Sequence, residues 1–152
     1  MPKGSCIFCR VASGATPSYK VYEDKKYVAF LDLYPNVAGQ VLLVPKKHMN
    51  SLFSSLSPRE LTDFMLAVRK VANIMRRRLG VSRVHLVLEG TGVKHLHAKL
   101  YPASGYDGGK FKAAVAAESV FFKKYPGYVT SQLGPRASAA SLKRIQERLA
   151  GN

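Results

Sequence analysis

The feature that most constrains the fold is the segment from Ser57 to Gly80, which has the pattern of one long amphipathic helix. Ser57 is suited to the N-cap, Pro58 to the first helical position, and Glu60 completes an S-x-x-E capping box. Gly80 follows the last periodic residue, as expected at a helix C-terminus. Apolar residues recur at spacings of three and four, which predicts one buried face. Its members are Leu61, Phe64, Met65, Val68, Val71, Ala72, Met75 and Leu79.

Short segments on both sides of this helix are typical of β-strands, because they are rich in Val, Tyr, Leu and Phe and lie between turn signals. Strands are expected over residues 20–23, 27–31 and 40–45 before the helix, and over 83–89 and 96–101 after it. The last two are joined by a short glycine-containing connection, Gly90 to Lys94. The predicted body therefore combines one long helix with several strands.

Turn-forming residues from Pro102 to Gly109 separate a body, residues 1–102, from a C-terminal extension, residues 103–152. The extension has a second turn-rich region at 125–127 and a predicted helix over 139–149, with Ser138 at its N-cap. Its aromatic side chains predict that it packs, on the same domain or on a partner chain.

The charge of the chain favours anionic partners such as nucleotides or nucleic acid. The 152 residues contain 24 Lys and Arg against 9 Asp and Glu, a formal charge of +15. The basic residues are spread along the chain, which is also typical of a generally basic surface. The run Arg76 to Arg78 falls in the last helical turn, where cations oppose the helix dipole. No run of about 18 apolar residues predicts a membrane span, and we expect a cytoplasmic protein.

Cys6 and Cys9 form a C-x-x-C motif, which in a reducing compartment binds metal or performs redox chemistry. With His48 and His95 they would make a closed, tetrahedral structural zinc site. An alternative places zinc on His95 and His97 together with His48 or His85, with an open position for a reactive water. The alternative leaves both cysteines without a role, so the closed site is favoured.

The stretch HLHAK predicts a division between structure and chemistry. In a strand over 96–101, side chains alternate between two faces. One face carries His95, His97 and Lys99, and the other carries Leu96, Ala98 and Leu100. If His95 binds zinc, His97 is free to attack an activated phosphorus. Lysines beside it would hold the phosphate oxygens. The alternative is a strand whose polar face is merely exposed.

The motifs C-I-F-C, V-Y-E-D, A-F-L-D, P-x-x-x-G and V-P-K-x-H, then a long helix and H-L-H-A-K, follow one another over about residues 6 to 102. In this order the chain resembles the histidine triad (HIT) family of nucleotide hydrolases and transferases. The resemblance implies an α+β, HIT-like fold, an antiparallel sheet with one long helix. It also implies a homodimer whose central sheets join.

The resemblance assigns roles to individual residues. His97 corresponds to the histidine that becomes nucleotidylated at an α-phosphate, and Asp32 to the acidic residue that binds the ribose hydroxyls. The ligands of the structural zinc found in many members correspond to Cys6, Cys9, His48 and His95. The apolar pocket around the base corresponds to Ile7, Phe8, Phe30 and Leu33.

The chain departs from the family pattern at three places. Gln40 stands where another active-site histidine is usual, Lys99 replaces the last histidine of the triad, and the connection 90–94 is short. Lysine holds a phosphate oxygen as a point charge but is a poor proton donor at its usual pKa of about 10.4. We expect Lys99, with Thr91 and Gln40, to position the phosphate.

Three functions follow. The first is an enzyme that cleaves a nucleoside phosphoanhydride or phosphoramidate, or transfers the nucleotidyl group, through a nucleotide bound to His97. The second is a nucleotide-binding or regulatory protein in which Gln40 and Lys99 mark the loss of catalysis. The third is nucleic-acid binding through the basic surface, for which the sequence offers charge but no motif.

Overall fold

The computed structural model describes residues 6–105 and 138–140 of the 152-residue chain. Two compact units are distinguished, Met1–Lys110 and Phe111–Asn152. The turn-rich region predicted at 125–127 lies outside the described residues. Of the predicted helix 139–149, only residues 139 and 140 are described, and they are helical after an exposed Ser138. The fold below is that of residues 6–105.

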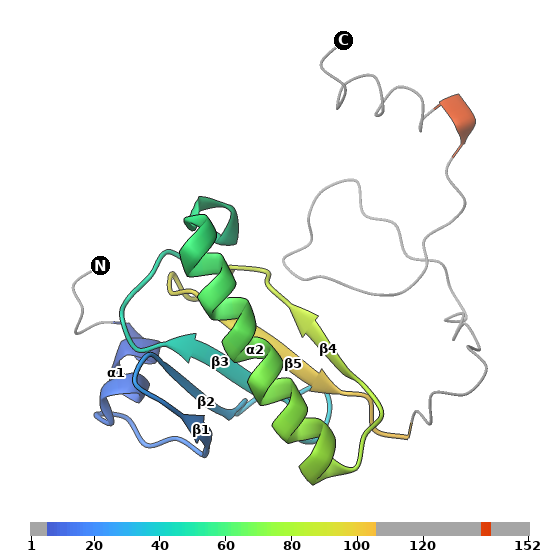
Figure 1. Cartoon of the computed structure of the whole chain (residues 1–152), viewed down its shortest axis with the longest axis horizontal. Coiled ribbons are helices and arrows are strands. Elements are labelled where there is room, and N and C mark those ends of the chain that lie inside the picture. Colours follow the sequence, from blue (N-terminus) through green and yellow to red (C-terminus); the bar gives the residue numbers. More distant parts are fainter. Residues whose placement is uncertain (1–5, 106–137, 141–152) are drawn as a thin grey trace. The chain divides into compact units, whose positions relative to one another are not determined.

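Five strands form one antiparallel sheet, in the order β1-β2-β3-β5-β4 (Figure 1). They are β1 (Lys20–Glu23), β2 (Tyr27–Leu31), β3 (Val41–Pro45), β4 (Val84–Val87) and β5 (Ala98–Pro102). The bounds predicted for β1 and β2 are confirmed. Every strand predicted in the sequence is present, and β1 and β4 are the edges of the sheet.

Three strands begin or end elsewhere than predicted, because backbone groups at their ends bond outside the sheet. The Gln40 N–H donates to the Val37 carbonyl, so β3 begins one residue later. The Leu96 N–H donates to the Met49 carbonyl, and β5 begins only at Ala98. His95 and His97 therefore lie on the segment that leads into β5. The fourth strand is shorter than predicted at both ends.

The long helix α2 (Pro58–Leu79) is confirmed in its bounds and in its capping. The Ser57 side chain accepts from the Glu60 N–H, the Glu60 carboxylate accepts from the Ser57 N–H, and Gly80 closes the helix at φ 64°. Its buried residues are Phe64, Ala67, Val68, Val71 and Met75. None of the described helices is long and apolar enough to cross a membrane.

Two residues predicted for the buried face of α2 are exposed. Met65 is 36% exposed and Leu79 is 49% exposed. The contact stripe runs through Phe64 and Val68, and Met65 lies one residue, about 100° of rotation, to its side. Leu79 lies beside Gly39 in the loop before β3, at the edge of the sheet contact. The prediction was therefore wrong at these two positions, and it missed Ala67.

The sheet has two differently used faces, because side chains alternate along each strand. Ala29 and Leu43 face α2 with the even-numbered residues from Leu96 to Leu100. Val28 and Leu42 belong to a second apolar cluster with Phe8 of α1. This short helix, α1 (Ile7–Ser13), was not predicted. Figure 1 shows α2 running across the sheet, with α1 beside the ends of β2 and β3. The α1 face carries the candidate site.

Candidate functional site

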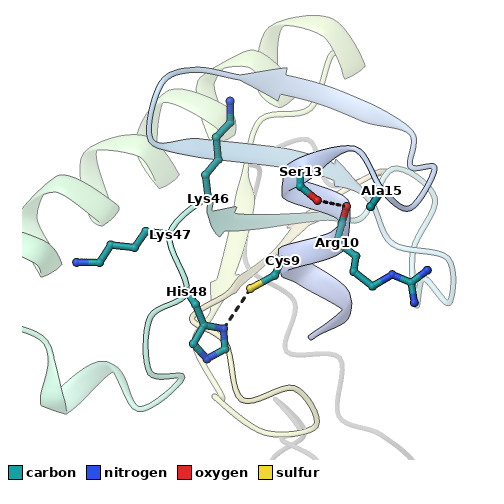
Figure 2. A pocket seen from close by; sticks show the side chains of 7 residues that line it. All are labelled: Cys9, Arg10, Ser13, Ala15, Lys46, Lys47 and His48. Atoms are coloured by element: carbon teal, nitrogen blue, oxygen red, sulfur yellow. Dashed lines mark hydrogen bonds between the residues drawn. The ribbon is translucent and has the colours of Figure 1, made fainter. Parts of the chain in front are cut away.

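Four predicted metal ligands converge where α1 meets the sheet. Cys6 and Cys9 come from the start of α1, His48 follows β3, and His95 precedes β5. Their ligand atoms all lie within 4.8 Å of one another. The Cys9 Sγ is 3.2 Å from His48 Nδ1, and Figure 2 shows the His48 ring pointing to that sulfur. The Cys6 Sγ is 3.4 Å from His95 Nδ1. These four residues can hold a metal ion.

The hydrogen bonding of His95 fixes which of its nitrogens faces the cysteines. His95 Nε2 lies 2.8 Å from the Pro45 carbonyl oxygen, and because a carbonyl only accepts, Nε2 carries the proton. In the neutral ring Nδ1 then has a free lone pair directed at the sulfurs. Burial lowers the pKa of His95, which favours this neutral form, and the neighbouring imidazoles act in the same direction. Two thiols and two imidazoles are the donor set of a closed zinc site.

The alternative zinc site does not form among the described residues. His97 is absent from the cluster of possible ligands, and His85 is an exposed residue of β4 that pairs with Tyr101. The closed arrangement predicted from the C-x-x-C motif is the one that the fold brings together.

His97 has the opposite tautomer arrangement to His95. Its Nδ1 lies 2.7 Å from the His95 carbonyl oxygen and donates to it. The lone pair of the neutral ring is therefore on Nε2, which has no hydrogen-bond partner within the described part of the chain. The ring packs edge-on against Phe8, with centroids 5.3 Å apart, and the residue is only 3% exposed. A neutral imidazole with a free Nε2 is a nucleophile.

An apolar cavity of about 310 Å³ opens between α1, β2 and the loop that follows β2. All five residues predicted to surround a nucleoside line it: Ile7, Phe8, Phe30, Asp32 and Leu33. Thr16, Ser18 and Val93 also line it, and the sequence patterns did not identify them. His97, Lys99, Gln40 and Thr91 are not among the lining residues. Phe8, which lines this cavity, also contacts the His97 ring.

Gln40 is tied to Asp32 by direct bonds. Its amide nitrogen donates to Asp32 Oδ2 at 2.6 Å, and its amide oxygen accepts from the Asn36 N–H at 2.8 Å. The other Asp32 oxygen accepts from the Tyr34 N–H at 2.9 Å. Since both carboxylate oxygens are anchored, the side chain has a fixed orientation at the cavity wall. Gln40, which is only 2% exposed, thus helps to hold the Asp32 carboxylate in this orientation.

Lys99 forms an ion pair with Glu89, a residue that no sequence motif had indicated. Burial of Lys99 opposes its charge, but the hydrogen bond and the charge of Glu89 outweigh this effect and raise its pKa. The lysine is therefore charged at neutral pH. Thr91, the third residue expected at the phosphate, is exposed in the turn after β4.

A second cavity lies between α1 and the segment after β3, and two of the four possible metal ligands, Cys9 and His48, line it. Basic side chains line it, but Figure 2 shows that those of Arg10, Lys46 and Lys47 point in different directions. Lys46 is also paired with Glu23 at 2.7 Å. The basic groups of this cavity do not converge on one point.

Comparison with known proteins places this geometry in a family. The family model for the HIT domain matches residues 13–103, more than half of the chain. The chain belongs to the HIT family. The matched segment begins at the last residue of α1, so the two cysteines and the α1 residues that line the apolar cavity lie before it.

Named HIT proteins resemble the chain over most of its length. The adenosine 5'-monophosphoramidase of Saccharomyces cerevisiae is 31% identical over 125 residues, 78% of this chain and 75% of the relative. A histidine triad protein from Clostridium difficile superposes with a TM-score of 0.59 at 34% identity, covering 70% of this chain and 96% of the other. A Zn-bound histidine triad family protein from Mycobacterium smegmatis gives 0.57 at 28% identity, covering 69% and 79%. The α+β HIT fold expected from the sequence is confirmed.

Proposed function

We propose that this HIT protein is a nucleotide hydrolase or nucleotidyl transferase. It acts at the α-phosphate of a nucleoside phosphoramidate or a (di)nucleoside polyphosphate. The observation that carries the proposal is the state of His97: its Nδ1 donates to a backbone carbonyl, which leaves the lone pair on Nε2. The yeast relative named as an adenosine 5'-monophosphoramidase supports the same chemistry.

The reaction follows from the arrangement of the site. The apolar cavity holds the base, and Asp32, fixed by Gln40, accepts hydrogen bonds from the ribose hydroxyls. His97 Nε2 attacks the α-phosphorus, an N–P bond forms, and the bond to the leaving group breaks with its electron pair going to that group. Water then attacks the phosphorus, the N–P bond breaks, and the nucleoside monophosphate departs with release of a proton. In a transferase another acceptor replaces water.

A zinc ion at Cys6, Cys9, His48 and His95 would have a structural role in this proposal. With four protein ligands it has no open position for substrate. Bound there, it would tie α1 to the segments after β3 and before β5, and so keep Phe8 against His97. The Zn-bound relative from Mycobacterium smegmatis supports zinc as the metal.

Turnover of adenosine phosphoramidate and of a diadenosine polyphosphate tests the function. We expect release of AMP by the wild-type chain and at least a 1,000-fold loss, about 4 kcal/mol of transition-state stabilisation, in His97→Ala. His85→Ala is the matched control, because it removes an exposed imidazole from the neighbouring strand. Absence of wild-type turnover, or equal turnover in His97→Ala, would overturn the proposal.

A second candidate function is nucleotide binding without efficient catalysis. Both residues that replace family histidines are engaged inside the protein, Gln40 with Asp32 and Lys99 with Glu89. Calorimetry with AMP, run beside the turnover assay, separates the two functions. Tight AMP binding without turnover favours this candidate.

We also infer a homodimer that forms through β4. This strand is an edge of the sheet, and its His85 and Leu86 are exposed. An unprotected edge strand offers its backbone groups to another strand. Light scattering should give twice the mass of one chain, and Leu86→Lys should give the mass of one.

A further inference from the structure

Glu89 and Lys99 are neighbours for reasons set by the backbone. Val87 of β4 lies directly opposite Lys99 of β5, and Glu89 follows two residues later on the same side as the lysine. Gly90 then turns the chain at φ 68°, and a Cβ at this position would meet the Ser51 carbonyl oxygen at 2.6 Å. The chain beside Glu89 is thus fixed by a close approach that only glycine permits. The side chain of Glu89 is 12% exposed.

The charges around Lys99 contrast with the charge of the whole protein. Its ammonium forms an ion pair with the Glu89 carboxylate, and Tyr101 and Asp32 act on its pKa in the same direction. The Lys99 ammonium is therefore paired with an anion although the formal charge of the chain is +15. Gln40, the other replaced family position, contributes a neutral amide. Lys99 and Glu89 together carry no net charge.

This charge distribution should make the site less favourable for an anionic leaving group than for an uncharged one. The single α-phosphate of a nucleotide needs one cation, and Lys99 is close enough in the sheet to His97 to supply it. A further phosphate that approached Lys99 would come close to Glu89, its ion-pair partner, and two anions in a partly buried site repel each other strongly. An uncharged amine on phosphorus meets no such repulsion, and where it carries an N–H the carboxylate also accepts a hydrogen bond from it.

We propose that Glu89 is a specificity-determining residue that selects against anionic leaving groups and favours neutral or amine leaving groups. The inference rests on the proposed function, since it concerns the group that departs when His97 attacks. It narrows the substrates of this chain to nucleoside monophosphate derivatives whose substituent carries no negative charge. Glu89 acts because its carboxylate lies beside Lys99, where the further phosphate of an anionic leaving group would otherwise bind.

Calorimetry of the full chain with AMP, ADP and AMP-morpholidate tests this inference without requiring turnover. We expect the wild-type chain to bind AMP-morpholidate at least about tenfold more tightly than ADP. In Glu89→Gln the affinity for ADP relative to AMP should rise about tenfold. Glu23→Gln is the matched control, because Glu23 also pairs with lysines but lies on β1, and it should leave the ratio unchanged.

The outcomes separate this inference from the proposed function. An ADP to AMP ratio in Glu89→Gln that equals the wild-type ratio would overturn the role of Glu89, even if turnover is normal. If that variant does not fold, a wild-type preference for ADP over AMP-morpholidate would overturn it instead. A shifted ratio in a chain that turns over neither substrate would uphold the role of Glu89 and reject the proposed function.

Discussion

The two faces of the sheet are built for different purposes. The face under α2 is closed by a large cluster of apolar side chains, among them Phe64, Leu43 and Leu100. The face under α1 has a smaller apolar cluster and carries the buried polar residues Gln40, His95 and His97. Buried polar groups are stable only where they are bonded. The α2 face is therefore closed by apolar packing, whereas the α1 face depends on a network of hydrogen bonds and carries four residues that can hold a metal ion.

The largest effect on stability is expected on the α2 face. Phe64→Ala leaves a cavity between the helix and Tyr27 of the sheet, and should cost about 3–5 kcal/mol in the free energy of unfolding. Urea denaturation measures it. Leu66→Ala, at an exposed position of the same helix, should change stability by less than about 0.5 kcal/mol. Equal effects of the two substitutions would contradict the contrast between buried and exposed sides of α2.

Removal of the metal should act on the α1 face. If free zinc is about 100-fold above its dissociation constant, chelation costs about 2.7 kcal/mol and lowers the melting temperature. Differential scanning calorimetry with and without chelator measures the change. In Cys6→Ser the chelator should produce no further shift, because a ligand is already missing. If the chelator leaves the wild-type melting temperature unchanged, the stability of the α1 face does not depend on a metal.

Loss of the Gln40 amide should affect binding more than stability. Gln40→Ala frees one oxygen of Asp32, and AMP should bind about tenfold more weakly, a loss of about 1.4 kcal/mol. The affinity for 2'-deoxy-AMP should fall less, because this nucleotide lacks one of the hydroxyls that donate hydrogen bonds to Asp32. Asn50→Ala is the control, since the Asn50 side chain accepts from the Leu52 N–H, outside the site. An equal loss for both nucleotides would mean that Gln40 does not act through Asp32.

The smallest effect is expected at the start of α2. Ser57→Ala removes the capping bond to the Glu60 N–H and should cost about 1 kcal/mol. This loss of stability should be the same with and without chelator, because the four possible metal ligands do not lie on the α2 face. Ser54→Ala, at an exposed position just before the cap, should have no effect. A capping cost that depends on metal would show that the two faces are coupled.

The elements with strong local signals were predictable from the sequence. α2 has a capping box, a proline at its first turn, a periodic face and a terminal glycine, and its bounds were predicted correctly. The alternation in HLHAK placed Leu96 and Ala98 on the apolar face correctly. By contrast, α1 has seven residues and an N-cap residue, Cys6, that makes no side-chain capping bond. A helix so short has too little periodicity to be recognised.

The chemistry of the two histidines was only partly predictable. The C-x-x-C motif indicated the metal ligands, but the proton positions depend on the carbonyl oxygens of Pro45 and His95. Pro45 is distant in the sequence, and no residue pattern encodes its contact with His95. Glu89 was missed for the same reason, because its partner Lys99 meets it only once β4 and β5 pair.

The central claim is that His95 is a metal ligand, whereas His97 forms the covalent bond to the nucleotide. Rapid quenching of the metal-loaded chain during turnover, under alkaline denaturing conditions, followed by peptide mass analysis, tests it most directly. The account predicts one adenylate on the peptide that contains His97, formed more readily from adenosine phosphoramidate than from a diadenosine polyphosphate, and none in His97→Ala. An adenylate on another residue, or turnover by His97→Ala at the wild-type rate, would contradict it.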